Sequence, residues 1–473
     1  MNLVRNHLRW IELAPGLRRF TIVAACILLA WIIGRLVMNE RFPLIVAGAA
    51  GLVGVMIVAF KLDWGVVLLL AATLFFKLGF ETGTESTLSL TLVLTAALTG
   101  IWIVRMLIED KRLHLRPSPV NRPLIAFAAV AIVSAIWSNL VRDPFVIVWD
   151  TFPKVQLGAL GTMVLSPAAA LLVANNLRTA RHIKVFIGLF MAAAVAGLAH
   201  IYFHVDLSTL NTRGLFPLWA ITLAAGQALF NKSLTKRARV GYGFIALSWF
   251  IYQIGEGVTW KSGWVPPLIS GLVLATLYSR RLAIGLIVVV MIFVVARSDY
   301  LGSILEEENA ESGVTRLAAW QQNWDITREH WLLGTGPAGY AVYYMSYIPD
   351  RAMATHSNYI DVISQVGVIG SAALVWMLAT TGRAAWQLTH RVPRGGFEQG
   401  LAYSLLAGFV GLLVAMGLGD WFLPFAYTQG IAGYDYTVWS WMMIGLIMIL
   451  HQSFTAATTS ASNRDRDAIA HLA

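Results

Sequence analysis

The sequence predicts an all-α fold, a polytopic transmembrane helical bundle that forms one integral membrane domain over residues 1–473. Hydrophobic residues make up 58% of the chain and charged residues only 13%, whereas roughly a quarter of an ordinary soluble domain is charged. Apolar runs of about 20 residues, the length of a helix that crosses a ~30 Å hydrocarbon core, repeat along the chain. This pattern favours helices over a barrel of short alternating strands.

Fourteen candidate spans follow one another, near residues 20–38, 43–60, 64–80, 88–108, 123–140, 155–176, 183–203, 214–230, 240–256, 264–279, 281–297, 356–380, 401–420 and 433–451. The runs at 64–80 and 264–279 are short, so twelve or thirteen spans also fit. The basic start of the chain precedes a first run without a small-residue cleavage site, which predicts a retained span rather than a signal peptide.

Basic residues gather in alternate connectors, and with fourteen spans all of these connectors fall on one side of the membrane. They contain Arg5, Arg9, Arg18, Arg19, Lys111, Arg112, Arg116, Arg122, Arg178, Arg181, Lys184, Lys232, Lys236, Arg237, Arg239, Arg280, Arg281, Arg383, Arg391 and Arg394. The positive-inside rule makes that side cytoplasmic. Both termini, including the polar tail at 455–473, are then cytoplasmic, and the large loop at 298–355 lies outside.

The net charge of +10 is therefore explained by orientation among membrane lipids, and we expect no nucleic-acid partner. Cys26 is the only cysteine, which excludes an intrachain disulfide and a zinc site built from several cysteines.

The large loop is the one long segment that is neither membrane-like nor a short connector. After a polar, acid-rich opening, residues 314–331 are predicted to form an aromatic helix. Leu317, Trp320 and Trp324 would share one apolar stripe, which suits either a roof over a cavity or an anchor on the bilayer surface. A glycine turn follows, and His356 opens the next apolar run.

Four cationic or titratable residues on the outer side are the candidate functional residues: Arg213, Lys261 and His356 near span ends, and Arg316 within the large loop. Guanidinium and ammonium groups without matching acids suit a diphosphate, because Arg binds phosphate oxygens bidentately and Lys supplies a point charge. A histidine beside them could accept a proton from an attacking hydroxyl. The alternative for each residue is structural, since outer Arg residues often reach lipid headgroups and a His at a span start is often interfacial.

Two other motifs are poor candidates. The sequence GTGPAG at 334–339 has the spacing G-x-G-x-x-G, but no strand precedes it and no βαβ unit surrounds it, so we interpret it as a turn. His200 and His204 are spaced as a possible metal pair near Asp206, but no further ligand completes a site. We expect no metal site.

Three pieces of the loop region together resemble a known family. They are Thr315-Arg316 through Trp320, HWLLGTGPAGY at 330–340 and HSNYIDVISQVGVIG at 356–370. In order and spacing they are similar to the signature region of the O-antigen ligase and O-antigen polymerase superfamily, where an Arg and an aromatic helix precede a G-x-G turn and a His opens a span that ends G-x-x-G. The resemblance is specific over about 210–370.

The resemblance implies transfer of a glycan from an undecaprenyl-diphosphate carrier at the outer face of the bacterial inner membrane, without a nucleotide sugar, metal or other cofactor. Carried over by motif, Arg316 would bind the diphosphate and His356 would position or activate the acceptor hydroxyl. Arg213 matches an earlier outer Arg of the family, and Lys261 stands where the family often has a Ser-Arg pair. The sequence RGLFPLW after Arg213, Gln365 in place of Glu and Trp331 in place of Pro depart from the family pattern and leave the subfamily open.

Several acceptors remain open. A ligase would use lipid A-core, an O-antigen or exopolysaccharide polymerase would use a second lipid-linked repeat, and a protein or a secondary cell-wall polymer are further acceptors. The large loop and the match around His356 favour the ligase. A glycolipid transporter or flippase is the alternative of another class, but it would place functional charges near the membrane midplane and often has repeated halves, whereas the candidates here lie at outer span ends.

Overall fold

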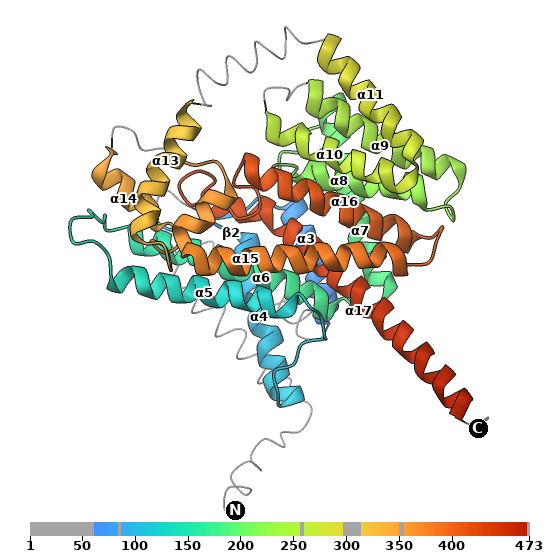
Figure 1. Ribbon diagram of the computed structural model, residues 1–473, viewed down its shortest axis with the longest axis horizontal. Coiled ribbons are helices and arrows are strands. Elements are labelled where there is room, and N and C mark those ends of the chain that lie inside the picture. Colours follow the sequence, from blue (N-terminus) through green and yellow to red (C-terminus); the bar gives the residue numbers. More distant parts are fainter. Residues whose placement is uncertain (1–60, 84–86, 256–259, 297–313, 350–353, 471–473) are drawn as a thin grey trace, which may run out of the picture.

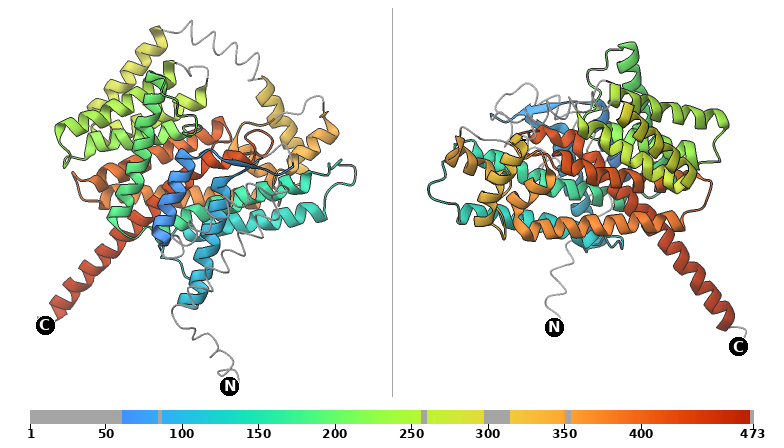
Figure 2. Two further views of the ribbon diagram at one scale, coloured as in Figure 1. Left: turned by 180° about the vertical axis from the view of Figure 1, so that it is seen from behind. Right: turned by 45° about the horizontal axis from the view of Figure 1, so that its top comes forward.

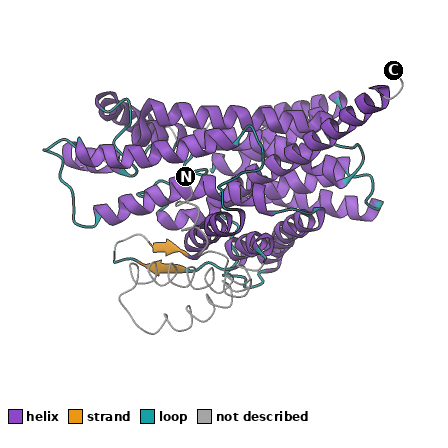
Figure 3. Ribbon diagram, turned by 90° about the horizontal axis from the view of Figure 1, so that it is seen from below, coloured by secondary structure: helices purple, strands orange, loops and turns teal. Residues whose placement is uncertain are grey.

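The structure is a computed structural model of the 473-residue chain and describes residues 61–83, 87–255, 260–296, 314–349 and 354–470. This described part is almost entirely helical, and its strands are the short antiparallel pair β1 (Gly79–Glu81) and β2 (Thr87–Ser89) (Figure 3). The all-α prediction is confirmed. The expected spans at 20–38 and 43–60, with Cys26, lie outside the described residues.

The helices occur where apolar runs are expected. Their bounds are α3 (Leu62–Phe75), α4 (Leu90–Arg105) continued by η2 (Met106–Asp110), α5 (Asn121–Leu140), α6 (Phe152–Asn176), α7 (Ala180–Phe203), α8 (Phe216–Phe230), α9 (Lys236–Gly255), α10 (Lys261–Tyr278), α11 (Arg280–Ala296), α15 (Asn358–Arg391), α16 (Phe397–Leu418), η5 (Ile431–Gly433) and α17 (Tyr434–Ala470). The large loop contains α13 (Val314–Glu329) and α14 (Gly339–Tyr347). The predicted loop helix is thus confirmed, whereas α17 runs well beyond the expected span end at 451 and through most of the polar tail.

Seven helices within the described ranges are long and apolar enough to cross a membrane. These are Leu90–Asp110, α5, α6, α7, α15, α16 and Ile431–Thr455, and α3 and α8 are apolar but shorter. Helices α9, α10 and α11 occupy three more of the expected spans. The chain is therefore a polytopic helical membrane protein, and the total of fourteen spans stays a prediction.

The helices pack in two groups joined by α16. In one group α15 packs on α5, and α17 and α5 pack on α6. In the other, α8 and α10 pack on α16, with α9 against α8 and α11 against α10. Because α16 also contacts α15 and α17, the groups form one bundle, from which the end of α17 projects (Figures 1 and 2).

Glycines allow α16 to approach its neighbours closely. A Cβ on Gly226 of α8 would lie 2.7 Å from the carbonyl oxygen of Gly400 on α16, and a Cβ on Gly411 would lie 2.8 Å from that of Pro266 on α10. Small residues at such crossings bring helix backbones together where no water drives association. The crossing of α16 with α8 and α10 therefore depends on residues without side chains.

Several basic connectors lie at one end of the bundle, called the basic end below. The backbone N–H of Ser233, after α8, donates to the carbonyl of Gly395, before α16 (3.1 Å). The Nζ of Lys184, at the start of α7, lies 5.6 Å from the centroid of the Phe397 ring. The structure thus brings three of the basic connectors to the same end, as their predicted common side requires.

Helices α13 and α14 of the large loop lie at the opposite end, called the loop end below, beside the connector between α5 and α6 (Figure 1). The N–H of Ile147 in this connector donates to Oγ of Ser346 in α14 (2.8 Å), and Tyr347 Oη donates to Asp143 Oδ2 (2.5 Å). Helix α14 and this connector are therefore joined at the end of the bundle away from the basic connectors.

Candidate functional site

The glycine turn docks into a break in α15. Gly367 has φ +65°, which interrupts helical hydrogen bonding inside α15. The turn takes up the backbone groups that the break frees: the N–H groups of Thr335 and Gly336 donate to the carbonyls of Ser364 and Gln365, both at 2.9 Å, and the N–H of Val368 donates to Trp331 (2.8 Å). The turn is therefore a structural connection that fixes the entry to α15.

Glycine is required at both faces of this contact. A Cβ on Gly367 would lie 2.2 Å from the carbonyl oxygen of Leu332, and a Cβ on Gly334, at φ +70°, would lie 2.5 Å from the backbone of Gln365. Side chains rarely adopt this left-handed backbone region. The G-x-G motif consequently serves close backbone packing at this position.

Helix α13 is docked on α15 by polar side chains of its inner face. The Trp320 indole Nε1 donates to the carbonyl of Thr355 (2.7 Å), and Ser364 Oγ of α15 hydrogen-bonds to Asn323 Oδ1. Leu317 and Trp324 point outward instead and are 67% and 57% exposed. The predicted apolar stripe is therefore wrong as a single face, because Trp320 turns toward the bundle while the other two do not.

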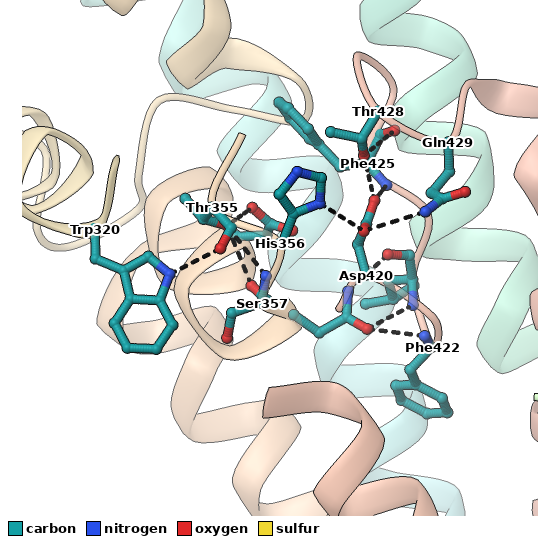
Figure 4. A network of polar contacts seen from close by, with 12 residues as sticks. Trp320, Thr355, His356, Ser357, Asp420, Phe422, Phe425, Thr428 and Gln429 are labelled. Atoms are coloured by element: carbon teal, nitrogen blue, oxygen red, sulfur yellow. Dashed lines mark hydrogen bonds and ion pairs between the residues drawn. The ribbon is translucent and has the colours of Figure 1, made fainter. Parts of the chain in front are cut away.

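His356 lies in the segment that leads into α15, with its imidazole toward Asp420 (Figure 4). Its side chain is 48% exposed, and its Nδ1 lies 3.9 Å from Oδ1 of Asp420, whose side chain is only 1% exposed. His356 has φ +48°, an uncommon backbone conformation for a residue with a side chain. One edge of the imidazole thus faces a buried carboxylate while part of the ring remains open.

Asp420 follows the end of α16 and is held by the loop that it begins. Its Oδ2 accepts from the Phe425 N–H (3.3 Å) and from Thr428 Oγ1, and its Oδ1 accepts from Gln429 Nε2 (3.4 Å). Asn358 at the start of α15 fixes the same loop, since its Oδ1 accepts from the N–H of Phe422 (2.8 Å). These bonds hold Asp420 and the start of α15 in one rigid arrangement (Figure 4).

Arg213 is connected to this arrangement through α17. Its guanidinium carbon lies 5.9 Å from the centroid of the Tyr436 ring, a cation–π contact. Tyr436 Oη donates to Gln429 Oε1, and the amide of Gln429 donates to Asp420. A chain of two side chains therefore leads from the exposed Arg213 to the carboxylate that faces His356.

Lys261 follows a tryptophan that packs against this loop. It is the first residue of α10, directly after Trp260. The Trp260 ring packs edge-on against Trp421, with centroids 5.4 Å apart, and Trp421 lies 6.1 Å from Tyr436. Because Trp421 adjoins Asp420 in sequence, Lys261 stands at the border of the same loop.

Arg316 is half-buried in the first turn of α13, one helical turn before Trp320. The bond from Trp320 to Thr355 places this part of α13 beside the residue that precedes His356. His356 and Arg213 thus contact the segment 420–436 directly, whereas Lys261 and Arg316 lie near the segments 420–436 and 354–358 through Trp260 and Trp320. None of the contacts described above joins two of the four residues directly, and the four are related only through these two segments.

Sequence reasoning had not identified Asp420, Gln429 or Tyr436, or the buried Asp361 described below. The available signal was an acidic residue directly after a glycine at a span end, in GLGDWF at 417–422. An isolated Asp at a span end has the same local appearance whether it faces solvent or a histidine distant in sequence. The packing of α15 against α16 brings His356 and Asp420 together.

Titration of groups outside the spans reflects burial at the loop end. Burial raises the pKa of Tyr344 to about 12 and lowers the pKa of His330, whose ring lies 4.8 Å from that of Tyr343. The hydrogen bond from Tyr347 lowers the pKa of the Asp143 carboxyl. These groups tie α14 to its neighbours.

The predicted histidine pair takes a different geometry. His204 has φ +52° and follows the last residue of α7, while His200 Nδ1 contacts the carbonyl oxygen of Val205 (2.7 Å). The spacing that would have aligned them on one helical face therefore does not apply. Across the described ranges, no group of three or more His, Cys, Asp or Glu residues is arranged to hold a metal ion.

Three chemical features lie along these two segments: cations that suit phosphate oxygens, a half-exposed imidazole beside a buried carboxyl group, and aromatic faces. Such a set can bind an anionic leaving group and accept a proton beside it.

A family model described as O-Antigen ligase matches residues 261–375, which begin at Lys261 and include Arg316 and His356. Arg213 and Asp420 lie outside the matched region. No curated protein matches the chain significantly.

Proposed function

We propose that this protein is an O-antigen ligase-like membrane glycosyltransferase, and the match of residues 261–375 to a family model described as O-Antigen ligase supports this proposal. It moves a glycan from an undecaprenyl-diphosphate carrier to a hydroxyl of lipid A-core or a similar acceptor. The observation that carries the proposal is the pairing of the half-exposed His356 with the buried Asp420 between segments that also border Arg213, Lys261 and Arg316.

The reaction is a single displacement. The acceptor oxygen forms a bond to the anomeric carbon of the donor glycan, and the bond from that carbon to the diphosphate oxygen breaks. The diphosphate leaves with the electron pair, and the hydroxyl proton passes to His356. No metal or nucleotide takes part in this step.

His356 is suited to this transfer by its orientation. Its Nδ1 faces Asp420, so we assign the proton-accepting role to Nε2, while Nδ1 keeps its proton toward the carboxylate. The 3.9 Å separation is too long for a direct hydrogen bond, and the two groups form an ion pair only when the imidazole is protonated. The buried charge of Asp420 stabilises the imidazolium that forms when the acceptor is deprotonated.

The diphosphate is assigned to Arg213, Arg316 and Lys261. Charge builds up on the leaving group as the glycosidic bond breaks, and preformed cations that face that charge lower the barrier. A diphosphate leaves readily, so stabilising it contributes more than the strength of the base. We expect Arg316 to contribute most, because the docked α13 holds it in place, and Lys261 least.

The site is assigned to the periplasmic face of the bacterial inner membrane. Support comes from the separation of the loop end from the basic end, since an excess of Lys and Arg marks the cytoplasmic side. The same rule makes both termini cytoplasmic.

The test is an in vitro transfer assay with the purified protein, an undecaprenyl-diphosphate-linked glycan and either of two acceptors, lipid A-core or a second lipid-linked glycan. Addition of a chelator and omission of nucleotides should leave product formation unchanged. Glycosylated lipid A-core supports the ligase, and a lengthened lipid-linked glycan indicates a polymerase. Movement of the donor across proteoliposomes without any product would instead establish a transporter.

A further inference from the structure

A second buried carboxylate, Asp361, lies behind His356. It belongs to the first turn of α15 and is 2% exposed. Its Oδ1 accepts two hydrogen bonds, one from Tyr340 Oη of α14 (2.8 Å) and one from Thr355 Oγ1, the residue before His356. Asp361 therefore connects the large loop to the segment that carries His356.

Thr355 is fixed on both sides. Its hydroxyl donates to Asp361, and its carbonyl accepts from the Trp320 indole (2.7 Å). The N–H of Ser357 points back to Thr355 Oγ1 (3.4 Å), which closes a tight loop around His356 (Figure 4). The left-handed backbone of His356, φ +48°, is strained and persists only where neighbours hold it. Thr355, fixed by Asp361 and Trp320, is the neighbour that holds this backbone conformation.

Tyr340, which donates to Asp361, also packs against the loop that holds Asp420. Its ring stacks on Phe425, with centroids 4.5 Å apart and planes 9° apart, and the Phe425 N–H donates to Asp420 Oδ2 (3.3 Å). Asp361 thus stands between the backbone of His356 and the loop that holds the partner of its imidazole.

Burial of this carboxylate is costly in itself. Its Oδ2 has no hydrogen-bond partner in the part of the chain that the structure describes. A buried polar atom without a partner destabilises the fold, and an apolar residue of similar volume is often better for stability. Stability alone therefore does not account for an aspartate at 361.

We propose that Asp361 is a positioning residue of the transferase: through Thr355 it holds the left-handed backbone of His356 that turns the imidazole toward Asp420. This inference rests on the proposed function, in which His356 accepts the proton of the acceptor. Asp361 touches no substrate, and its effect reaches the reaction only through His356.

The experiment measures kcat and the donor KM of glycan transfer for two matched pairs of variants. Thr355→Val removes the hydroxyl at nearly constant shape, and Thr355→Ser keeps it. Asp361→Leu removes the acceptor, and Asp361→Asn keeps one acceptor oxygen. We expect Thr355→Val and Asp361→Leu to lower kcat about 10- to 100-fold, since a small misplacement of a reacting group has effects of this size. The donor KM should stay within about threefold, and the Ser and Asn variants should recover most of kcat.

Two double variants separate positioning from a general structural role. Thr355→Val combined with Asp361→Leu should be no slower than Asp361→Leu alone, because both remove one connection. In a His356→Ala background, Asp361→Leu should cause no further loss. Ser404→Ala removes hydrogen bonding from a buried side chain of α16 and is the stability control. It should lower the melting temperature while kcat is maintained.

Unchanged kcat in Thr355→Val would overturn the inference, and so would a further loss when Asp361→Leu is added to His356→Ala. If Asp361→Leu does not fold, the Thr355 pair decides alone. Failure of the proposed function has a different signature, namely a wild-type protein that forms no glycan product or a His356→Ala variant as active as the wild type.

Discussion

Basic residues have different surroundings at the two ends of the bundle. At the basic end, Arg239 Nε donates to the carbonyl of Ala228 at the end of α8 (2.8 Å), and Arg391 Nη1 donates to Thr455 Oγ1 (2.7 Å). These contacts satisfy helix carbonyls and surface hydroxyls. At the loop end, Arg213 stacks on Tyr436, whose hydroxyl leads to a buried carboxylate opposite a histidine.

The two ends thus differ in the groups that their cations contact: helix carbonyls and a hydroxyl at the basic end, and an aromatic ring at the loop end. A guanidinium that caps a helix interacts favourably with the carbonyl dipoles at the helix end. A guanidinium beside an imidazole and aromatic faces can share an anionic ligand with them. Substitutions at the two ends should therefore affect different quantities, stability at one and transfer at the other.

The largest effect is expected for Arg316→Ala. Loss of the main diphosphate contact should lower kcat/KM about 10³-fold or more, because stabilisation of the leaving group is lost. The matched control is Arg391→Ala at the basic end, which should keep transfer near the wild-type level. The measurement is initial transfer rate at equal amounts of folded protein, and an active Arg316→Ala variant would contradict the assignment.

His356→Ala should lower kcat about 10²- to 10³-fold while donor binding is largely retained. The reason is that the imidazole handles the proton of the acceptor and does not hold the diphosphate. Donor affinity, measured with a fluorescent lipid-linked glycan, is the second readout. A variant that loses donor binding and retains kcat would reverse the roles of His356 and the arginines.

Asp420→Asn should lower kcat about 10- to 100-fold with little change in shape. The amide removes the charge that stabilises the imidazolium while it keeps an oxygen for the Phe425 N–H. Thermal unfolding of the variant checks that the loop remains intact. Normal kcat in a stably folded Asp420→Asn protein would show that the pairing with His356 is only structural.

Arg213→Ala and Lys261→Ala should have smaller effects, mainly on the donor KM. Arg213→Ala should raise the donor KM about tenfold, and Lys261→Ala should raise it less, since each substitution removes one charged contact to phosphate. Lys261→Arg keeps the charge and should remain close to the wild type. If Lys261→Ala and the wild type have the same donor KM at low salt, Lys261 does not belong to the site.

The smallest effect concerns His330 and stability. Burial lowers the pKa of His330 from its ordinary value of 6.5, so the folded protein binds this proton less readily than the unfolded chain does. The free energy of unfolding is therefore undiminished by His330 above about pH 6.5, and it decreases as the pH falls below that value. His330→Phe should reduce the drop in melting temperature between about pH 7.5 and about pH 5.5, whereas His390→Phe at the basic end should not. An equal drop in all three proteins would exclude His330 as the cause.

Local features made much of the fold predictable. The helices α3 to α11 and α15 to α17 occur at the apolar runs, and the loop helix expected at 314–331 is found at Val314–Glu329. The sequence did not reveal the break of α15 at Gly367, because the run remains apolar through it and the turn that satisfies its backbone precedes it in the chain. It also did not reveal that Trp320 and Trp324 diverge, because docking of α13 decides which face is inner.

The sequence by itself determined the membrane class and the grouping of the basic connectors, and it identified Arg316 and His356 as candidates for the proposed site. Each of these depends on properties that neighbouring residues share: apolar length, local charge and a motif of contiguous residues. Only the tertiary structure decided that His356 faces Asp420, that Arg213 stacks on Tyr436 and that Asp361 holds Thr355. Contacts between separate helices depend on how the helices pack, and the sequence around each residue carries little record of the partner that packing supplies.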